Sequence, residues 1–579
     1  MSSDIEALLG SVSADRLMEV TRGISRWARL SGTADELRAV EYVKGVLEGY
    51  GMETAILRHE AYISLPGAAS IDILHASGAV AVPAITHAMA APTGPDGITG
   101  RLVHVGEGFA VDYQGRDLTG CIALTEGLAS EDKVMFAQDA GAIGIVNIND
   151  AHTHEMIVSP VWGSPTRAEA ALLPRIPVLS VADAEGPALR AQASEGGDLR
   201  LFAEVDTGWR EVPLLEARID GEEDDFVLFS GHIDSWHFGA MDNGTANATM
   251  VEVARILKTM GRSRRGLRLC FWSCHSHGRY AGSAWYADTH FEELSDHCVA
   301  HVNIDSVGAI GASVLSHGVA MAEMRPLARS VIAEIAGQPF HGARPGRSGD
   351  QSFVGIGIPS LFMSLSEQPL TDDPVSRAFA ALVGAEGDAG GLGWWWHTTE
   401  DTMDKIDEGN LVRDCRIYLK VVHTLLSEPL LVLDYGAAAG EVESELRRLQ
   451  EVAEGRFDLS RLIWRAAELK EKAALLYQRG LDGNVPDGAR TTFNLEMKRI
   501  ARSLNPVAYT KAGRFAHDLA LGVMPRVPLL SGLEELARAD GDMERMMVVE
   551  LRRAHNIVAD GLREALTAAS RALAASGEA

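Results

Sequence analysis

The chain alternates between two patterns of apolar residues, one with helical spacing and one typical of strands. Residues 16–30 and 34–51 carry apolar side chains every three or four positions, which predicts two helices. Gly51 ends the second helix in the manner of a C-terminal cap. Residues 52–65 then alternate as an extended segment does. The first part of the chain is therefore a helical pair that leads into a strand.

Residues 66–201 contain short runs typical of strands, with one helical stretch among them. The runs are GRLVHVG, GCIALTEG, AIGIVNIND and RIPVLSV, and the helical stretch is SEDKVMFAQDAGA. Short strands bounded by glycine and polar residues predict a small β-rich domain.

Residues 202–434 alternate buried-type strands with helices. The strand and helix segments are DFVLFSGH, ATMVEVARILKTM, GLRLCFWSC, HVNIDSVG, LARSVIAEIAG and GIPSLFMSL. This alternation predicts a mostly parallel sheet that is flanked by helices on both faces. Binding sites in such sheets lie at the carboxyl ends of the strands, and the polar motifs of this segment follow apolar strands.

Residues 435–579 have helical periodicity almost throughout. The predicted fold class is therefore α/β with two additions. Residues 1–65 and 202–434 form the domain with the mostly parallel sheet, residues 66–201 form an inserted β-rich domain, and residues 435–579 form a C-terminal helical domain.

Charge and cysteine content narrow the possible partners. The chain has 53 basic and 80 acidic residues, a net charge of −27, which disfavours nucleic acid and anionic lipid as partners. No run of about 18 apolar residues predicts a membrane span. The five cysteines are scattered without a CxxC pair, and the N-terminal residues lack the pattern of a secretory signal. These features predict a protein of the reducing cytoplasm.

Histidines and aspartates follow successive strands in a pattern typical of a metal centre. His232 and Asp234 follow one apolar strand, and Asp242 lies in a tight turn that opens a helix. Asp305 ends the strand HVNID, and His397 follows three tryptophans. The two histidines with Asp242 and Asp305 suit a divalent ion, zinc or else manganese. Asp234 is spaced to orient His232, which makes it a candidate catalytic residue.

These residues resemble the zinc aminopeptidase family that includes glutamate carboxypeptidase and the transferrin receptor. The matched motifs are Gly231-His232-Ile233-Asp234-Ser235, Asp242, Asp305, the loop with Gly349-Asp350 and Phe353, and His397-Thr398-Thr399-Glu400-Asp401-Thr402. The resemblance implies that one metal takes His232, Asp242 and Asp305, and that a second takes Asp242, a glutamate and His397.

The resemblance also covers the two additions. Gly120–Leu124, Lys133–Ala142 and Ile143–Ile148 resemble the strand–helix–strand of a protease-associated domain, so residues 66–201 are expected to be such an insertion. The C-terminal helices resemble the dimerisation domain of the glutamate carboxypeptidase group. A symmetric homodimer is therefore expected.

One motif departs from the family pattern. The family carries a Glu-Glu pair after an apolar strand, the first as general base and the second as ligand of the second metal, whereas this chain has FWSCHSHGRYAGS. Alignment from Trp272 puts His275 and Ser276 at these positions, and alignment from Gly282 puts Ser276 and His277 there. Neither alignment leaves a carboxylate.

Three outcomes of this replacement stay open. In the first, His275 acts as general base, which an imidazole can do at neutral pH. In the second, His275 or His277 replaces the glutamate as a metal ligand. In the third, the chain is a catalytically inactive homologue that binds a partner or acts as a scaffold. The expected function is hydrolysis of a C–N amide bond by metal-activated water in an atypical site. The loss of a carboxylate predicts one tightly held metal and a weak or absent second one.

The substrate is expected to be a small molecule or a short peptide. Arg279 and Tyr280, directly after the altered motif, are candidate contacts to an oxyanion or a carboxylate. Trp396, with the two tryptophans before it, is a candidate apolar wall beside His397.

Overall fold

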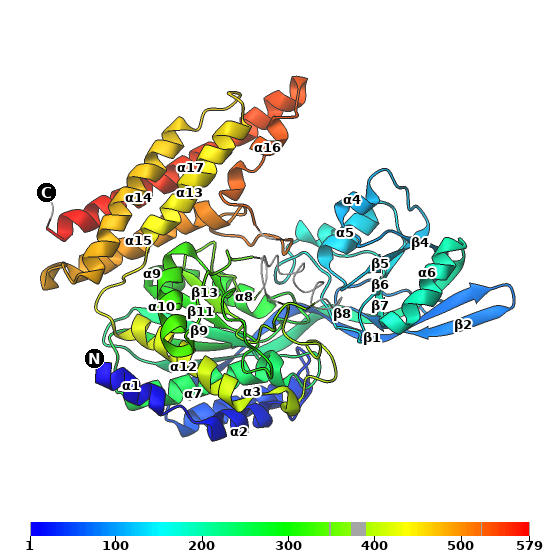
Figure 1. Ribbon diagram of the computed structural model, residues 1–579, viewed down its shortest axis with the longest axis horizontal. Helices are drawn as coiled ribbons and strands as arrows, with labels where there is room; N and C mark the ends of the chain where they lie inside the picture. The colour runs from blue at the N-terminus through cyan, green and yellow to red at the C-terminus, as the bar shows by residue number, and fades with distance from the viewer. Residues whose placement is uncertain (1, 347–348, 372–389, 523, 578–579) are drawn as a thin grey trace.

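The computed structural model describes residues 2–346, 349–371, 390–522 and 524–577, with side chains from residue 5. Figure 1 shows three parts: a central sheet covered by helices, a smaller lobe beside it, and a helical bundle at the C-terminus. The predicted class, a sheet flanked by helices with a C-terminal helical region, is confirmed. The sheet is mixed.

One sheet runs through both the central part and the smaller lobe, in the order β12-β13-β11-β9-β10-β8-β4-β5-β6-β7-β3, and β1 pairs with β8 and β2. Its central strands are β8 (Asp198–Ile219), β9 (Phe226–His232), β10 (Gly266–Trp272), β11 (Cys298–Ile304), β12 (Val319–Ala320) and β13 (Ser360–Met363). Those of the lobe are β1 (Glu53–His75), β2 (Gly78–Pro83), β3 (Ile85–Thr86), β4 (Ile98–His104), β5 (Cys121–Glu126), β6 (Gly144–Ile148) and β7 (Val178–Val181).

The neighbouring strands β10, β9, β11 and β13 are parallel to one another. Every residue of β9, β10 and β11 is buried, as expected for strands that are covered on both faces. The helices around this half of the sheet are α1 (Ser2–Gly10), α2 (Ala14–Ile24), α3 (Ala34–Gly49), α7 (Ala246–Thr259), α8 (Ala281–Thr289), α9 (Phe291–His297), α10 (Arg325–Ala336) and α12 (Glu408–Ser427).

The smaller lobe places its own parallel strands β4, β5, β6 and β7 beside short helices. These helices are α4 (Ala110–Tyr113), α5 (Glu131–Asp139) and α6 (Gly186–Ser194). The strand–helix–strand motif predicted within residues 120–148 therefore lies in β5, α5 and β6.

The long strands β1 and β8 join the two halves of the sheet (Figure 1). They pair antiparallel from Glu53 with Arg218 to Ile73 with Leu199, with a register shift between Pro66 and Ala69. Both predicted boundaries of the insertion, at 65/66 and at 201/202, fall inside these strands. Pro66 still pairs with Val205 and the register shifts only after it, so the proline does not end the strand.

The C-terminal region consists of α13 (Tyr435–Val452), α14 (Ser460–Leu481), α15 (Arg490–Tyr509), α16 (Leu533–Leu536) and α17 (Gly541–Ala575). Leu446, Leu469, Leu504 and Leu562 are fully buried and belong to the same apolar cluster as the core of the central sheet. Across the described parts of the chain, α17 included, no helix combines the length and apolarity needed to cross a membrane.

A buried carboxyl lies where the bundle meets the central part. Glu323, in a short 3-10 turn before α10, accepts a hydrogen bond from Asn505 Nδ2 of α15 at 2.7 Å, and its Oε2 is buried with no hydrogen-bond partner among the described residues. Burial raises the pKa of Glu323 from 4.5 to about 7. This carboxyl is therefore protonated in the folded chain over a range in which the unfolded chain is ionised.

We expect stability to fall with rising pH because of Glu323. Its contribution is fully present below the unfolded pKa of 4.5 and is lost as the pH rises through about 7. A shift of this size corresponds to on the order of 3 kcal/mol in the free energy of unfolding. Urea unfolding at about pH 5 and about pH 7.5 measures it. Glu323→Gln should reduce this dependence of the free energy of unfolding on pH, and the exposed control Glu334→Gln should not. An equal change between the two pH values in the unaltered chain and both variants would show that Glu323 is not its source.

Candidate metal centre

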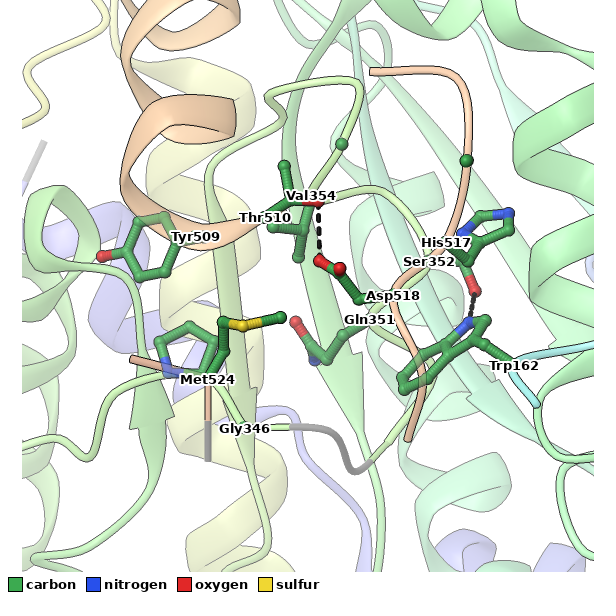
Figure 2. A pocket seen from close by; sticks show the side chains of 13 residues that line it. Trp162, Gly346, Gln351, Ser352, Val354, Tyr509, Thr510, His517, Asp518 and Met524 are labelled. Atoms are coloured by element: carbon green, nitrogen blue, oxygen red, sulfur yellow. Dashed lines mark hydrogen bonds between the residues drawn. The ribbon is translucent and has the colours of Figure 1, made fainter. Parts of the chain in front are cut away.

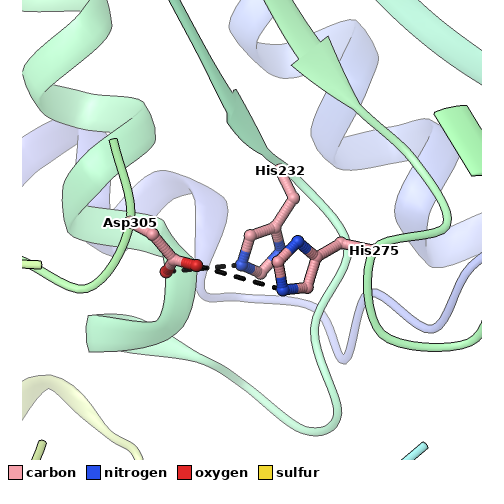
Figure 3. Close-up of side chains that lie close together, drawn as sticks. All are labelled: His232, His275 and Asp305. Atoms are coloured by element: carbon pink, nitrogen blue, oxygen red, sulfur yellow. Dashed lines mark ion pairs between the residues drawn. The ribbon is translucent and has the colours of Figure 1, made fainter. Parts of the chain in front are cut away.

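Three of the predicted residues lie at the carboxyl ends of adjacent parallel strands. His232 is the last residue of β9, His275 follows the end of β10 by three residues, and Asp305 directly follows β11. Their side chains converge, with Nε2 of both imidazoles aimed at Asp305 (Figure 3). One ligand atom from each of the three lies within 4.8 Å of the others, which is a spacing suited to one metal ion.

Asp242 brings His397 to the same place. Its Oδ1 is 3.0 Å from His232 Nε2, and its Oδ2 is 3.2 Å from His397 Nε2. Asp242 lies in the turn Ala240–Thr245 before α7, where Asp401 accepts hydrogen bonds from the backbone N–H groups of Met241 and Asp242 at 2.8 and 2.9 Å. The four residues that the sequence predicts as ligands apart from His277 therefore meet in one cluster.

The hydrogen bonds of the imidazoles fix which nitrogen faces the centre. His232 Nδ1 lies 2.9 Å from the carbonyl oxygen of Asp234, and His397 Nδ1 lies 2.6 Å from that of Glu155. A carbonyl oxygen only accepts, so each Nδ1 carries the hydrogen and each Nε2 presents a lone pair. Both lone pairs face oxygens of the Asp242 carboxylate, which also only accept hydrogen bonds. These atoms therefore repel one another unless a cation lies between them.

Two orphaned atoms show that this centre fits a divalent cation. His232 Nε2 and Asp242 Oδ1 are buried and have no hydrogen-bond partner within the described part of the chain. Burial by itself disfavours charge on both groups, yet the carboxylates around His232 raise its pKa, and the two imidazoles lower the pKa of Asp242. Imidazole nitrogen and carboxylate oxygen are donors that suit zinc. His232, Asp242 and Asp305 would hold such an ion, and His397 faces the other oxygen of Asp242.

Asp234, predicted to act on His232, organises the surrounding loops. Its Oδ1 is 3.5 Å from His232 Nδ1, and it accepts hydrogen bonds from the N–H groups of His275 and Ser276 and from Ser31 Oγ at 3.2, 2.9 and 2.7 Å. It therefore ties the altered loop after β10 to the loop after β9. The predicted catalytic role of Asp234 stays a prediction.

The two candidate histidines of the altered motif have different surroundings. His275 stacks on His232 with ring centroids 3.9 Å apart and belongs to the cluster. His277 is fully buried, with Nδ1 3.1 Å from Ser31 Oγ and 3.9 Å from Asp234 Oδ2, and it lies outside that group of three. The placement thus favours His275 over the predicted ligand His277 as the replacement for the lost glutamate.

The loop that presents His275 is compact because small residues allow it. A Cβ on Gly282 would lie 2.3 Å from the carbonyl oxygen of Ser273, so the first turn of α8 packs directly on the loop. Cys274, Arg279 and Tyr280 have positive φ angles of 66°, 45° and 69°. Such backbone is costly for residues other than glycine and is often found at functional sites.

The predicted substrate contacts fall into three settings. Tyr280 lies edge-on to His275 at 4.8 Å between centroids, and burial raises its pKa to about 12. Trp396 stacks on His397 at 3.5 Å between centroids. The Arg279 guanidinium instead binds Glu131 and the carbonyl oxygens of Ile157 and Ser159 in the inserted lobe. These contacts engage Arg279 in holding the lobe, and its contact with substrate stays a prediction.

Three residues for which the sequence predicts no individual role also support the centre. Asp401 holds the turn of Asp242, and burial raises its pKa to about 7. The Glu155 carbonyl, from the inserted lobe, fixes His397. Asp350 binds His275 Nδ1 at 2.9 Å. Asp401 and Asp350 stand in motifs that were recognised, whereas the segment around Glu155 carries no signal for this contact.

A separate pocket is lined in part by residues that directly follow Asp350 in the sequence (Figure 2). Gln351, Ser352 and Val354 from this loop, Trp162 from the inserted lobe, and Tyr509 and Asp518 from the C-terminal region are among its lining residues. None of the predicted metal ligands lines it. Two of these lining residues are joined directly, because Trp162 Nε1 donates a hydrogen bond to Ser352 Oγ at 2.9 Å.

The parallel part of the sheet carries imidazoles and carboxylates at the carboxyl ends of its strands, an arrangement that suits a metal-binding domain. Residues 215–422 match the family model described as Peptidase family M28, so the resemblance to the zinc aminopeptidases is confirmed. This matched segment contains His232, Asp242, Asp305 and His397, together with the altered motif.

Known relatives agree with that match. A probable glutamate carboxypeptidase of Arabidopsis thaliana, AMP1, is 25% identical over 370 residues, which cover 51% of this chain and 52% of the relative. The aminopeptidase YwaD of Bacillus subtilis is 23% identical over 66% of this chain and 78% of the relative. The chain spans about half the length of the glutamate carboxypeptidases AMP1 and VP8, 52% and 50%.

Solved structures show the same fold. A zinc aminopeptidase from Bacillus subtilis superposes with a TM-score of 0.55 at 20% identity and covers 72% of this chain and 96% of its own. A Peptidase M28 precursor from Shewanella amazonensis gives a TM-score of 0.57 at 18% identity, with 73% and 96% covered. At this identity the likeness establishes the fold alone.

Proposed function

We propose that the chain is a metal-dependent hydrolase that cleaves a C–N amide bond in a short peptide or a small molecule. The observation that carries the proposal is the convergence of His232, Asp242, Asp305 and His397, with a lone pair or a carboxylate oxygen of each aimed at one centre. A divalent ion held there, zinc or else manganese, supplies Lewis-acid chemistry, because it polarises a carbonyl and activates water.

Other residues of the chain position the ligands, flank the metal centre and offer contacts to the substrate. Asp401 and the Glu155 carbonyl hold Asp242 and His397 in place, and Asp234 holds the loop of His275. Nε2 of His275 faces the centre from the position of the lost Glu-Glu pair. This position suits the predicted general base, which takes the proton of water, and it also suits a ligand. Tyr280 and Trp396 lie beside the two imidazoles as candidate substrate contacts.

The cluster supports one tightly held ion. The second site of the family would use Asp242 Oδ2 and His397 Nε2, which lie 3.2 Å apart, with a glutamate that this chain lacks. Two donors without a third hold a divalent ion weakly, so the second ion is expected to be weak or absent.

A non-catalytic binding or scaffold protein is the second candidate. The observation that favours it is the absence of a carboxylate at residues 275–277. The intact ligand set favours the hydrolase, because buried carboxylates and imidazoles without a ligand are costly.

Assembly and location are further parts of the proposal. We propose a homodimer formed through the C-terminal helices, supported by Trp464 of α14 and Ile557 of α17, which are 61% and 57% exposed. The five cysteines, all free and buried, support a cytoplasmic location. The net charge of −27 supports the proposal that neither nucleic acid nor an anionic membrane is a partner.

The function is tested by metal analysis and a substrate screen. Protein purified without chelator is expected to contain about one zinc or manganese ion per chain. The metal-loaded protein should hydrolyse some member of a library of aminoacyl, dipeptidyl and simple amides, and chelation should abolish that activity. A chain that takes up neither ion would instead support the binding protein.

A further inference from the structure

His275 has a carboxylate behind it. Its Nδ1 lies 2.9 Å from Asp350 Oδ2, and the other oxygen of Asp350 accepts a hydrogen bond from Ser283 Oγ at 2.8 Å. Asp350 is 1% exposed, and among the described residues it forms an ion pair with His275 alone. An ionised carboxylate only accepts, so Nδ1 carries the hydrogen and the Nε2 of His275 presents a lone pair.

That lone pair is directed at the metal centre. The rings of His232 and His275 are stacked with 14° between their planes, and both Nε2 atoms point toward Asp305 (Figure 3). His232 Nε2 and His275 Nε2 lie 3.5 and 3.9 Å from the two oxygens of Asp305. Ligands of one zinc ion, each about 2 Å from the metal, lie at separations close to these.

We propose that His275 binds the metal ion itself, beside His232, Asp242 and Asp305, and that Asp350 is the positioning residue that presents its Nε2. The inference rests on the proposed metal centre and deepens it. Metal-binding histidines characteristically donate their second N–H to a carboxylate or a carbonyl. His232 and His397 use carbonyls in this way, and Asp350 gives His275 the same arrangement.

The positioning contact extends into the inserted lobe. Ser283 Oγ is 2.9 Å from Ser352 Oγ, which accepts the hydrogen bond from Trp162 Nε1 (Figure 2). Ser283 and Ser352 are both buried, so the chain of contacts is shielded from water. Asp350 is thus held on the side away from His275, and the imidazole loses little freedom when it binds an ion.

The test is the zinc affinity of Asp350→Asn, measured by competition with a chromophoric chelator. An amide does not hold the Nδ1 proton as a carboxylate does, so affinity should fall 10- to 100-fold, as is usual for loss of such a partner. The cobalt-loaded variant should also show a changed visible absorption band, because one nitrogen donor is lost. Asp414→Asn changes an equally buried aspartate whose hydrogen bonds are to Gly308 and Arg413 rather than to a predicted ligand, and it should retain the affinity of the unaltered chain.

A double-variant cycle separates positioning from general destabilisation. His275→Ala should weaken zinc binding at least as much as Asp350→Asn, and the two changes together should weaken it no further. Additive losses, or unaltered affinity in Asp350→Asn or in His275→Ala, would overturn the inference. If Asp350→Asn does not fold, His275→Ala alone decides whether this imidazole is a ligand. If the unaltered chain binds neither zinc nor manganese, the proposed function is wrong as well. If it binds zinc tightly and His275→Ala binds it equally tightly, this inference alone is wrong.

Discussion

Asp242→Ala is expected to reduce the bound metal from about one ion per chain to a trace. Asp242 supplies one oxygen toward His232 and the other toward His397, so its removal takes a negative ligand from the middle of the centre. Elemental mass spectrometry on protein purified without chelator measures this directly. Hydrolysis of any amide found in the screen should fall by about a thousandfold or more, because the ion contributes several kcal/mol of transition-state stabilisation.

Asp404→Ala is the matched control for this variant. Asp404 follows His397 in the same loop, and its side chain is 68% exposed. Its replacement should leave metal content and activity unchanged. Full metal content in Asp242→Ala would show that the ion, if present, is bound elsewhere and that the ligand assignment is wrong.

Ser276→Glu is expected to raise the metal content from about one ion to about two ions per chain. In the alignment from Trp272, Ser276 takes the position at which the family carries the glutamate ligand of its second metal. A new carboxylate there would join Asp242 and His397, and three donors hold zinc far more tightly than two. Isothermal titration of metal-free protein with zinc gives the number of ions and the affinity of each.

Ser276→Gln is the control, because it adds the same volume without the charge. Ser276 is 3% exposed, so both variants meet the same packing cost, and far-UV circular dichroism shows whether each folds. If Ser276→Glu folds and still binds a single ion, the alignment from Trp272 is wrong at this residue.

Local patterns predicted the fold class and the residues that meet at the centre. His232 and Asp305 stand at the ends of buried strands, and the carboxyl ends of neighbouring parallel strands lie at one edge of a sheet, so their meeting follows from the pattern. The periodicity of residues 435–579 likewise corresponds to the helices α13 to α17. These features depend on short-range spacing, which a single sequence records.

The remaining features depend on contacts between distant segments. Asp350 meets His275 across 75 residues, and the Glu155 carbonyl meets His397 across 242 residues. No rule of sequence spacing predicts contacts between residues this far apart in the chain. The bonds of Arg279 to the carbonyl oxygens of Ser159 and Ile157 likewise span 120 and 122 residues, and no local pattern predicts them. The choice between His275 and His277 also needed the structure, because both alignments of the altered motif are compatible with the sequence.

The ribbon of β1 and β8 gives the molecule a mechanical property. Two lobes joined by flexible linkers can swing apart to admit a ligand, but here both joining strands belong to the one sheet that runs through the two lobes. Relative rotation would have to bend this ribbon and break rungs of its ladder, and it would also pull the Glu155 carbonyl away from His397. We therefore expect the two lobes to move as one body, so that a ligand reaches the centre without a hinge motion between them.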